Sequence, residues 1–222
     1  IGNRIDKSDR LIYDILEDPD YPSDLLHLDT SLSNSFESEY LTQEAELGYQ
    51  IKFEKFRIQA ELEYERASLQ NDQFFPAPFV NDRTVEAFKP SFRMNYEWTR
   101  NKNVEVNYYT YVNKPSISQL QNVINDSNPL RLVTGNPDLD PTYTHRIRTR
   151  FRARNPDNET TFYMGVSTQI IEDYIANSTF IAREYTPITE DIALESGSQL
   201  VKPVNIQGYW NLWAYMNYGL PL

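Results

Sequence analysis

The chain has no cysteine among its 222 residues. This absence excludes a disulfide framework, a thiolate metal site and a cysteine nucleophile. Histidine is also scarce, because His27 and His145 are the only two, and neither has the spacing of a metal-ligand motif. No motif pairs a nucleophile with a base. We therefore predict no enzyme and no catalytic, cofactor-binding or metal-binding residues.

A long apolar run is absent too. No stretch of 18 or more apolar residues is present, which excludes a transmembrane helix but not a membrane-spanning strand, whose hydrophobicity alternates from residue to residue. An excess of positive charge is also missing. The net charge of -11 argues against nucleic-acid binding, since Lys and Arg are needed to neutralise phosphates.

What the sequence does have is alternation of apolar and polar residues. From Phe56 to Glu65 each apolar residue is followed by a polar one, and the same pattern runs from Phe88 to Trp98. Period-2 alternation predicts strands with one apolar and one polar face. Similar runs cover 41–53, 104–109, 146–154, 162–170 and 204–218. We therefore predict an all-β protein with about seven antiparallel strands.

The connections between these runs are of two kinds. The short ones lie at 54–55, 99–103 and 155–159, and the long ones at 67–87, 113–141 and 172–199. Short turns at one end and long loops at the other are typical of an up-and-down outer-membrane β-barrel. We predict one partial barrel domain over 1–222, with a leading segment at 1–38 and strands over 39–218. Aromatic residues near the short turns, such as Phe53, Phe56 and Trp98, fit an interfacial girdle.

Three segments resemble the barrel region of TonB-dependent receptors. The stretch PSISQLQNVINDSNPLRLVTGNPDLDP (115–141) is similar to the signature loop of that family, although Lys114 and Thr142 stand where Arg and Glu are expected. The segments LSNSFESEY (32–40) and PVNIQGYWNLWAYMNYGLPL (203–222) are similar to its strands. The signature-loop residues are Pro115, Gln119, Asn128, Pro129, Gly135, Asn136 and Pro137.

The resemblance implies a larger protein, with a transmembrane barrel of about 22 strands around an N-terminal plug. This chain would be a fragment of it, without the plug, the TonB box and the closing strands. The resemblance implies the cell outer membrane of a Gram-negative-type bacterium, contact with outer-membrane lipid, and substrate passage driven by an inner-membrane energy-transducing protein. A surface lipoprotein is a candidate partner.

Two alternatives stay open at this point. The first is a non-transporting outer-membrane barrel that serves as a scaffold or assembly component. The second is a soluble β-sheet binding protein, in which Ile58, Leu62, Phe92 and Met94 would form a core against a second sheet. Whether these side chains are covered or exposed distinguishes the soluble protein from the barrel.

The sharpest chemical feature is an arginine ladder, Arg146, Arg148, Arg150 and Arg152. An arginine facing lipid near the membrane midplane costs about 2–4 kcal/mol, so the ladder is predicted to face the lumen. It suits an anionic substrate or the plug. We favour charge balance with carboxylates instead, and the expected partners are Glu44, Glu46, Glu61, Glu63 and Glu65.

Tyrosines share the polar faces of these strands. Tyr109 and Tyr111 are predicted to face the lumen, as are Tyr163 and Tyr215, where a phenol ring suits a sugar, another ligand or the packed plug. Two acidic groups lack the spacing of a calcium loop, so solvated loop charge is favoured for both. Their members are Asp14, Glu17, Asp18, Asp20 and Asp24 in the first, and Asp126, Asp138 and Asp140 in the second.

Overall fold

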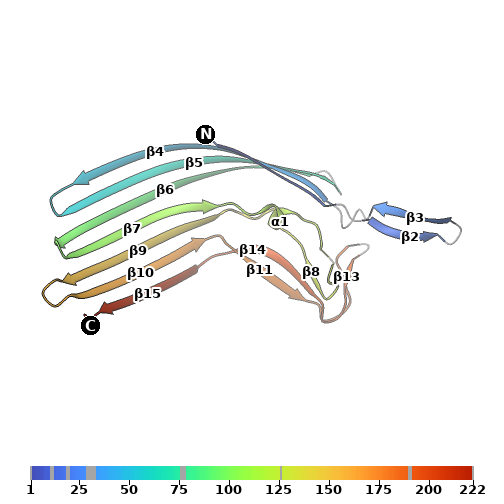
Figure 1. Ribbon diagram of the computed structural model, residues 1–222. Helices are drawn as coiled ribbons and strands as arrows, with labels where there is room; N and C mark the ends of the chain where they lie inside the picture. The colour runs from blue at the N-terminus through green and yellow to red at the C-terminus, as the bar shows by residue number, and fades with distance from the viewer. Residues whose placement is uncertain are drawn as a thin grey trace.

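The main body of the protein is one curved antiparallel sheet of eight strands, which we call the wall (Figure 1). The computed structural model describes residues 2–10, 13–18, 21–28, 34–75, 79–125, 127–189 and 192–221. The wall strands, in spatial order, are β1 (Gly2–Arg10), β4 (Asn34–Lys52), β5 (Phe56–Phe75), β6 (Phe79–Thr99), β7 (Lys102–Asn113), β9 (Thr142–Asn155), β10 (Thr160–Glu172) and β15 (Tyr209–Gly219).

The alternation of the sequence sets the register of the wall. Between β5 and β6, Ile58 lies opposite Met94, while Glu63 lies opposite Lys89. Like side chains therefore gather on like faces, because successive residues of a strand point to opposite sides. The short turns fall at 53–55, 100–101 and 156–159. These features confirm the predicted all-β, antiparallel, up-and-down arrangement.

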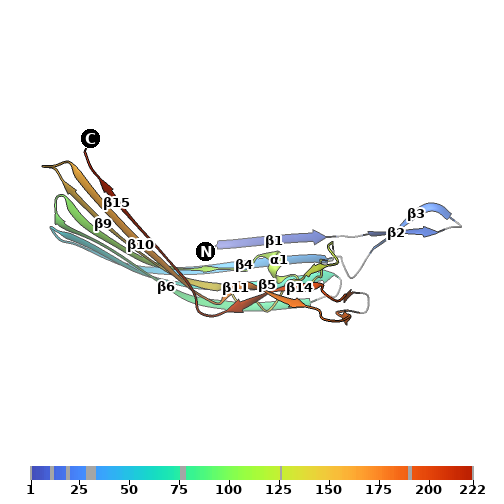
Figure 2. The ribbon, with the colours of Figure 1, turned by 90° about the horizontal axis from the view of Figure 1, so that it is seen from below.

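Strands β5 and β6 are longer than predicted. Residues 67–87, expected to be a loop, are mostly strand, because β5 continues to Phe75 and β6 begins at Phe79 in unbroken register. The expected loop is therefore wrong over most of its length. The sequence did not predict these strands because apolar and polar residues do not alternate regularly over 67–87, whereas backbone pairing does not require alternation. β1 adds an eighth strand against 34–42 of β4, and Figure 2 shows the long strands bending along their length.

The expected strand over 204–218 is also divided. Gly208 has a φ of +81°, a left-handed conformation that glycine adopts without a steric penalty. Before it, β14 (Gln199–Ile206) joins a smaller sheet, and after it β15 pairs with β10. The alternation continues through the turn, so the period alone did not reveal the break.

The predicted loops 113–141 and 172–199 fold together into what we call the loop module, which spans 114–141 and 173–208 and so includes the first residues of the expected strand over 204–218. It holds α1 (Ile117–Leu120) and a three-stranded sheet of β11 (Tyr174–Ile181), β14 and β8 (Arg131–Val133). Its remaining pair is β12 (Thr186–Pro187) with β13 (Ala193–Leu194). The module lies at the end of the wall opposite the short turns (Figure 1).

The loop module has its own small core. Leu132, Ala182 and Leu194 are buried together, and Leu120 packs with Leu139 nearby. Beyond it, β2 (Tyr13–Asp18) and β3 (Tyr21–Leu28) form a separate antiparallel pair. Within the described ranges, no helix has the length and apolar character that a membrane crossing requires.

Candidate functional site

One face of the wall carries an exposed apolar band. Leu47 is 78% exposed and Leu62 is 45% exposed, while Ile58, Phe92 and Met94 are half-buried on the same face. Other large members of the band are Phe88, Trp98, Trp210, Leu212 and Met216. In the soluble alternative these side chains would be covered by a second sheet. Their exposure contradicts that alternative, because a continuous apolar surface of this kind marks a lipid contact.

The band has the height of a membrane. On β6 it runs from Phe88 to Trp98, about eleven residues, which matches the length of a transmembrane strand. Aromatic pairs mark its two edges: the rings of Phe53 and Phe56 stack at 4.7 Å near a short turn, and those of Tyr64 and Phe88 lie 5.2 Å apart at the other edge. This is the expected place for interfacial girdles.

Beyond the edge of the band that Tyr64 and Phe88 mark, the same face becomes polar. Arg66 on β5 forms an ion pair of 3.7 Å with Glu86 on β6, and both side chains are exposed. Gln43 of β4 lies opposite Arg66. These charged and amide side chains suit contact with water, so the apolar band ends before Arg66 and Glu86.

The inner face of the wall holds the arginine ladder. The register sets Arg146 between Tyr109 and Gln169, and Arg150 between Glu105 and Gly165. The structure thus brings the predicted residues together on one polar face over β7, β9 and β10. These residues are Arg146, Arg148, Arg150, Arg152, Tyr109 and Tyr111.

The ladder is short of carboxylate partners. Within the described part of the chain, Arg150 is its one member with an ion pair, at 3.7 Å to Glu105. The Nε atom of Arg146 is buried and has no hydrogen-bond partner among the described residues. The five glutamates predicted to balance the ladder lie on β4 and β5, across β6 and β7. The predicted pairing is wrong, because β6 and β7 separate these carboxylates from the arginines of β9, and lysines hold three of the five.

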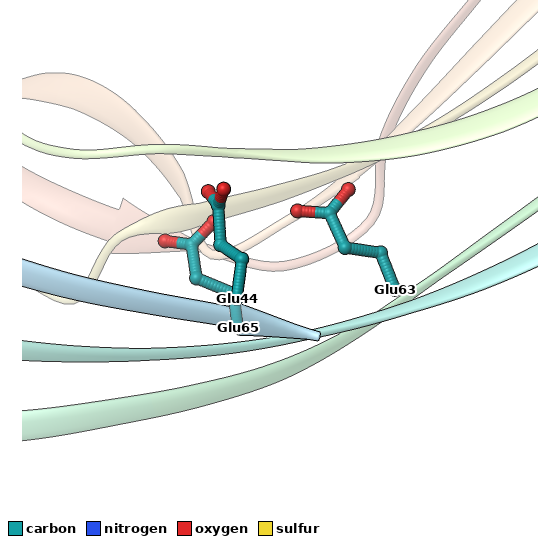
Figure 3. Close-up of side chains that lie close together, drawn as sticks. All are labelled: Glu44, Glu63 and Glu65. Atoms are coloured by element: carbon teal, nitrogen blue, oxygen red, sulfur yellow. The ribbon is translucent and has the colours of Figure 1, made fainter. Parts of the chain in front are cut away.

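Lys89 holds three of those glutamates. Its Nζ atom lies 2.6 Å from a carboxylate oxygen of Glu63, 2.6 Å from Glu65 and 4.0 Å from Glu44. Lys114 adds a contact of 3.9 Å to Glu65. The three carboxylates rise on the same side of β4 and β5, within 4.8 Å of one another (Figure 3). A cluster of this shape fits a cation, and here an ammonium group already supplies the charge.

The other two predicted partners also form no ion pair with the ladder among the described residues, although Glu61 lines the same hollow as Arg148 and Arg150. Glu61 accepts a hydrogen bond of 3.0 Å from the Ser91 hydroxyl, and Glu46 is exposed. The sequence did hold one signal for the true partner of the cluster. Lys89 falls on the polar face of its strand, so once the β5–β6 register is known it must stand opposite Glu63.

An aromatic pair borders the ladder on the side of β15. The rings of Trp213 and Tyr215 lie 4.8 Å apart, and Tyr163 stacks on Tyr215 at 6.2 Å. Tyr215 lies directly over Gly165, where a Cβ atom would come within 2.2 Å of the ring. A hollow of about 310 Å³ opens between this pair and the arginines. Trp213 was not among the predicted site residues, although the alternation places it on the polar face.

The opposite side of the ladder is less aromatic. Tyr109 and Tyr111 stack at 6.1 Å, and the Tyr111 hydroxyl accepts a hydrogen bond of 3.2 Å from Gln169. A second hollow, of about 460 Å³, lies between the ladder and the polar residues of β5 and β6. There Arg93 donates a hydrogen bond of 2.9 Å to Asn107.

The signature-loop residues build the loop module. A Cβ atom at Gly135 would meet the carbonyl oxygen of Gln121 at 2.1 Å, so this close backbone approach requires glycine. The Asn136 amide donates to the carbonyl of Pro203 at 3.0 Å, which joins the two segments of the module.

The rest of the signature shapes turns within the first segment. Gln119 accepts from the backbone N–H of Ser116, and Asn128 from that of Leu130. Pro115 is buried, Pro137 half-buried and Pro129 exposed. The signature therefore specifies a folded loop.

Asn205 was missed by the sequence reading. Its side-chain amide donates to the carbonyls of Asp140 and Asp173, and its oxygen accepts from the N–H of Asp140. One side chain thus joins both segments of the module at the end of the wall opposite the short turns. Asn205 lies inside the strand-like alternation of 204–218, which gave no hint of this role.

Of the two histidines and the two acidic groups, the structure describes the side chains of His145, Asp138 and Asp140. His145 lies on the outward face, with Tyr108 at 3.0 Å and Glu172 at 3.2 Å from its ring nitrogens. The side chains of His27 and of the acidic group over 14–24 lie outside the described residues, as does Asp126. Asp138 and Asp140 belong to the turn that ends the first segment of the module.

Comparison with known proteins identifies this architecture. The model of the family described as "Outer membrane protein beta-barrel family" matches residues 9–221. No curated protein matches the chain.

Similar solved structures are receptors. A double mutant of the Serratia marcescens hemophore receptor HasR, in complex with its hemophore HasA and heme, has a TM-score of 0.55 and 12% identity over 97% of this chain and 36% of that chain. A Pseudomonas aeruginosa ferric enterobactin receptor (PfeA) mutant, in complex with enterobactin, has a TM-score of 0.46 and 8% identity over 98% and 38%. The chain thus spans about a third of the length of these receptors.

These matches bear on three of the predictions. Together with the apolar band, they confirm the predicted transmembrane β-barrel and its location in the outer membrane. The resemblance to receptor barrels is confirmed at the level of family and fold.

Proposed function

Because the chain belongs to the outer membrane protein beta-barrel family, we propose that it forms part of a receptor that passes a substrate across the outer membrane. The energy comes from an inner-membrane complex acting on a plug, and both lie outside this chain. The single observation that supports the proposal is the contrast between the faces of the wall. Lipid-type side chains cover one face, and arginines with exposed aromatic rings cover the other.

A scaffold or assembly barrel has no need of the second feature. Arginines without carboxylate partners cost free energy wherever water is restricted. Their retention on an inner face is best explained by something that passes along it or binds to it. This reasoning favours transport over the scaffold alternative.

The loop module supports a receptor role at the outer end of the wall. It is a packed unit with buried Leu132 and Leu194, so it presents a shaped surface. Exposed apolar side chains on it include Leu130 and Tyr185. The similar structure of HasR contains a hemophore protein and heme. By analogy, we propose that the module contacts the ligand or a surface protein such as a lipoprotein.

Uptake by whole cells tests the proposal. In the source bacterium, a strain lacking the gene is compared with the complemented strain for accumulation of labelled heme, a ferric siderophore, and neutral and acidic oligosaccharides. We expect uptake of one of these to require the gene and to stop when an uncoupler collapses the proton gradient. Equal uptake of every compound by both strains would contradict transport and favour the scaffold.

The contribution of the loop module is tested separately by deleting Gln121 to Arg131 in the intact receptor. This deletion removes Ile124 from the module core and the bridge of Asn125 to Val133. We expect uptake to fall while the barrel still folds in the membrane. Unchanged uptake would count against ligand or partner contact by the module.

A further inference from the structure

We propose that the inner face of the wall binds an acidic oligosaccharide, a chain of sugar rings that carry carboxylates. The binding surface, here called the arginine–aromatic strip, consists of Arg146, Arg148, Arg150, Trp213 and Tyr215. The inference rests on the proposed transport function and names the substrate class for it.

The spacing of the arginines points to a repeating anion. Alternate residues of a strand lie about 6.6 Å apart on one face, so β9 presents a regular row of guanidinium groups. Each guanidinium offers a planar fork of donors that matches a carboxylate. A ligand with one acidic group would use a single arginine, whereas a chain with an acid on successive units can engage the row.

The charge of the strip is available to a ligand. Of its arginines, Arg150 alone has an ion pair within the described residues, and that partner is Glu105. Lys89 holds Glu44, Glu63 and Glu65. Glu61 lines the hollow of about 460 Å³ together with Arg148 and Arg150, but it accepts its hydrogen bond from the Ser91 hydroxyl and forms no ion pair with the strip among the described residues. The buried Nε of Arg146 lacks an acceptor among the described residues. Buried donors in native proteins are nearly always paired, so we expect this N–H group to donate to an acceptor that the described residues do not supply.

The aromatic pair supplies the surface for sugar rings. Trp213 is 60% exposed on the inner face, and Gly165 lets the ring of Tyr215 lie flat against β10. Flat amphipathic rings of this kind suit the apolar faces of a sugar, while the arginines reach its acidic groups. The hollow of about 310 Å³ is near the lower limit for a small-molecule site, which fits one or two sugar units of a longer chain.

An acidic protein segment is the competing occupant. Such a segment would neutralise the arginines, but it has no particular use for an exposed indole beside them. The combination of basic row and aromatic pair therefore favours the acidic sugar, and the requirement for Trp213 separates the two occupants.

Titration calorimetry on the full-length receptor in detergent micelles tests the inference. The probe is tetragalacturonate, and the neutral comparison is maltotetraose. We expect tetragalacturonate to bind at least tenfold more tightly, and binding to weaken as salt increases. Arg148→Gln is expected to reduce affinity about tenfold or more, since a hydrogen bond to a charged group is lost. Trp213→Leu is expected to reduce it about threefold to tenfold.

Two further variants serve as controls. Arg66→Gln removes the same charge from the outward face and is expected to leave affinity within about twofold. Arg148→Lys keeps the positive charge but not the planar fork, and a loss of about threefold is expected. If Arg148→Gln does not fold, judged by its heat-dependent migration in gels, the Arg148→Lys and Trp213→Leu variants still decide the question.

Three results would overturn the inference: no binding of tetragalacturonate, equal binding of maltotetraose, or affinity unchanged by the variants at Arg148 and Trp213. Tighter binding of an octaglutamate peptide, unaffected by Trp213→Leu, would assign the strip to an acidic protein segment instead. Loss of sugar binding together with gene-dependent uptake of another compound removes this inference alone. Arginine-dependent binding without any uptake removes the transport function alone.

Discussion

The wall and the loop module use apolar side chains in opposite ways. In the wall they point outward, and Leu47 is 78% exposed. In the module they point inward, and Leu194 and Leu132 are 0% and 2% exposed. The stability of the wall therefore depends on lipid as the apolar partner, whereas the module carries its own core in water. Apolar side chains of one chain are thus covered by lipid in the wall and by other side chains in the module.

The largest expected effect tests the core of the module. Leu194→Ala removes a fully buried side chain and leaves a cavity, so we expect the module to lose about 2–5 kcal/mol of stability. Leu47→Ala in the wall is the matched control and is expected to cost less, because lipid fills the space. Limited proteolysis of the module in folded receptor measures the difference. Equal sensitivity of the two variants would mean that the module has no independent core.

A charge on the lipid face tests the wall. Met94→Arg places a guanidinium within the apolar band and is expected to cost about 2–4 kcal/mol. Asn95→Arg, one residue along, points to the inner face and is expected to have a small effect. Urea titration of folding into lipid vesicles compares the two. Similar costs at both positions would contradict the assignment of faces.

Glycine substitutions sharpen the contrast at the level of the backbone. Gly135→Ala forces a Cβ atom against the Gln121 carbonyl, and we expect a loss of about 1–3 kcal/mol in the module. At Gly48 in the wall the nearest atom to an added Cβ is a side-chain carbon of Glu61 at 3.4 Å, so Gly48→Ala is expected to be tolerated. Thermal unfolding with both variants in micelles checks this. A tolerant Gly135 would show that the signature glycine is not structural.

The smallest expected effect concerns the exposed ion pair above the band. Arg66→Gln breaks the contact with Glu86, and both side chains are more than half exposed. Such pairs contribute about 0–1 kcal/mol, so the melting temperature is expected to change little. A large loss would indicate that this part of the wall is covered in the membrane and does not stand in water.

The strands of the band followed directly from the sequence. The run from Phe56 to Tyr64 alternates because one face meets lipid and the other meets polar groups. Each successive residue therefore switches between apolar and polar. The extension over 67–75 did not follow, since apolar and polar residues do not alternate regularly there, and backbone pairing does not require that they do. The break at Gly208 also escaped, because a single left-handed residue leaves the period intact.

The candidate site was predictable in its members but not in its partners. The period put the arginine ladder and Tyr109 on a polar face, and the structure brings them together. The partners depend on which strands lie side by side and at what height, which a local period does not contain. Lys114 reaches Glu65 from beyond the end of β7, a contact between residues distant in sequence.

The fold class, the two faces of the wall and the signature of the loop could all be predicted from the order of the residues. These properties are local, because a strand is recognised by the alternation of its own residues and a turn by its own glycines and prolines. Three features became visible in the folded chain alone: two distant loops share one core, Asn205 joins them, and Lys89 holds three glutamates away from the arginine ladder. Those outcomes depend on distances across the sheet, where geometry decides which charges and apolar groups meet.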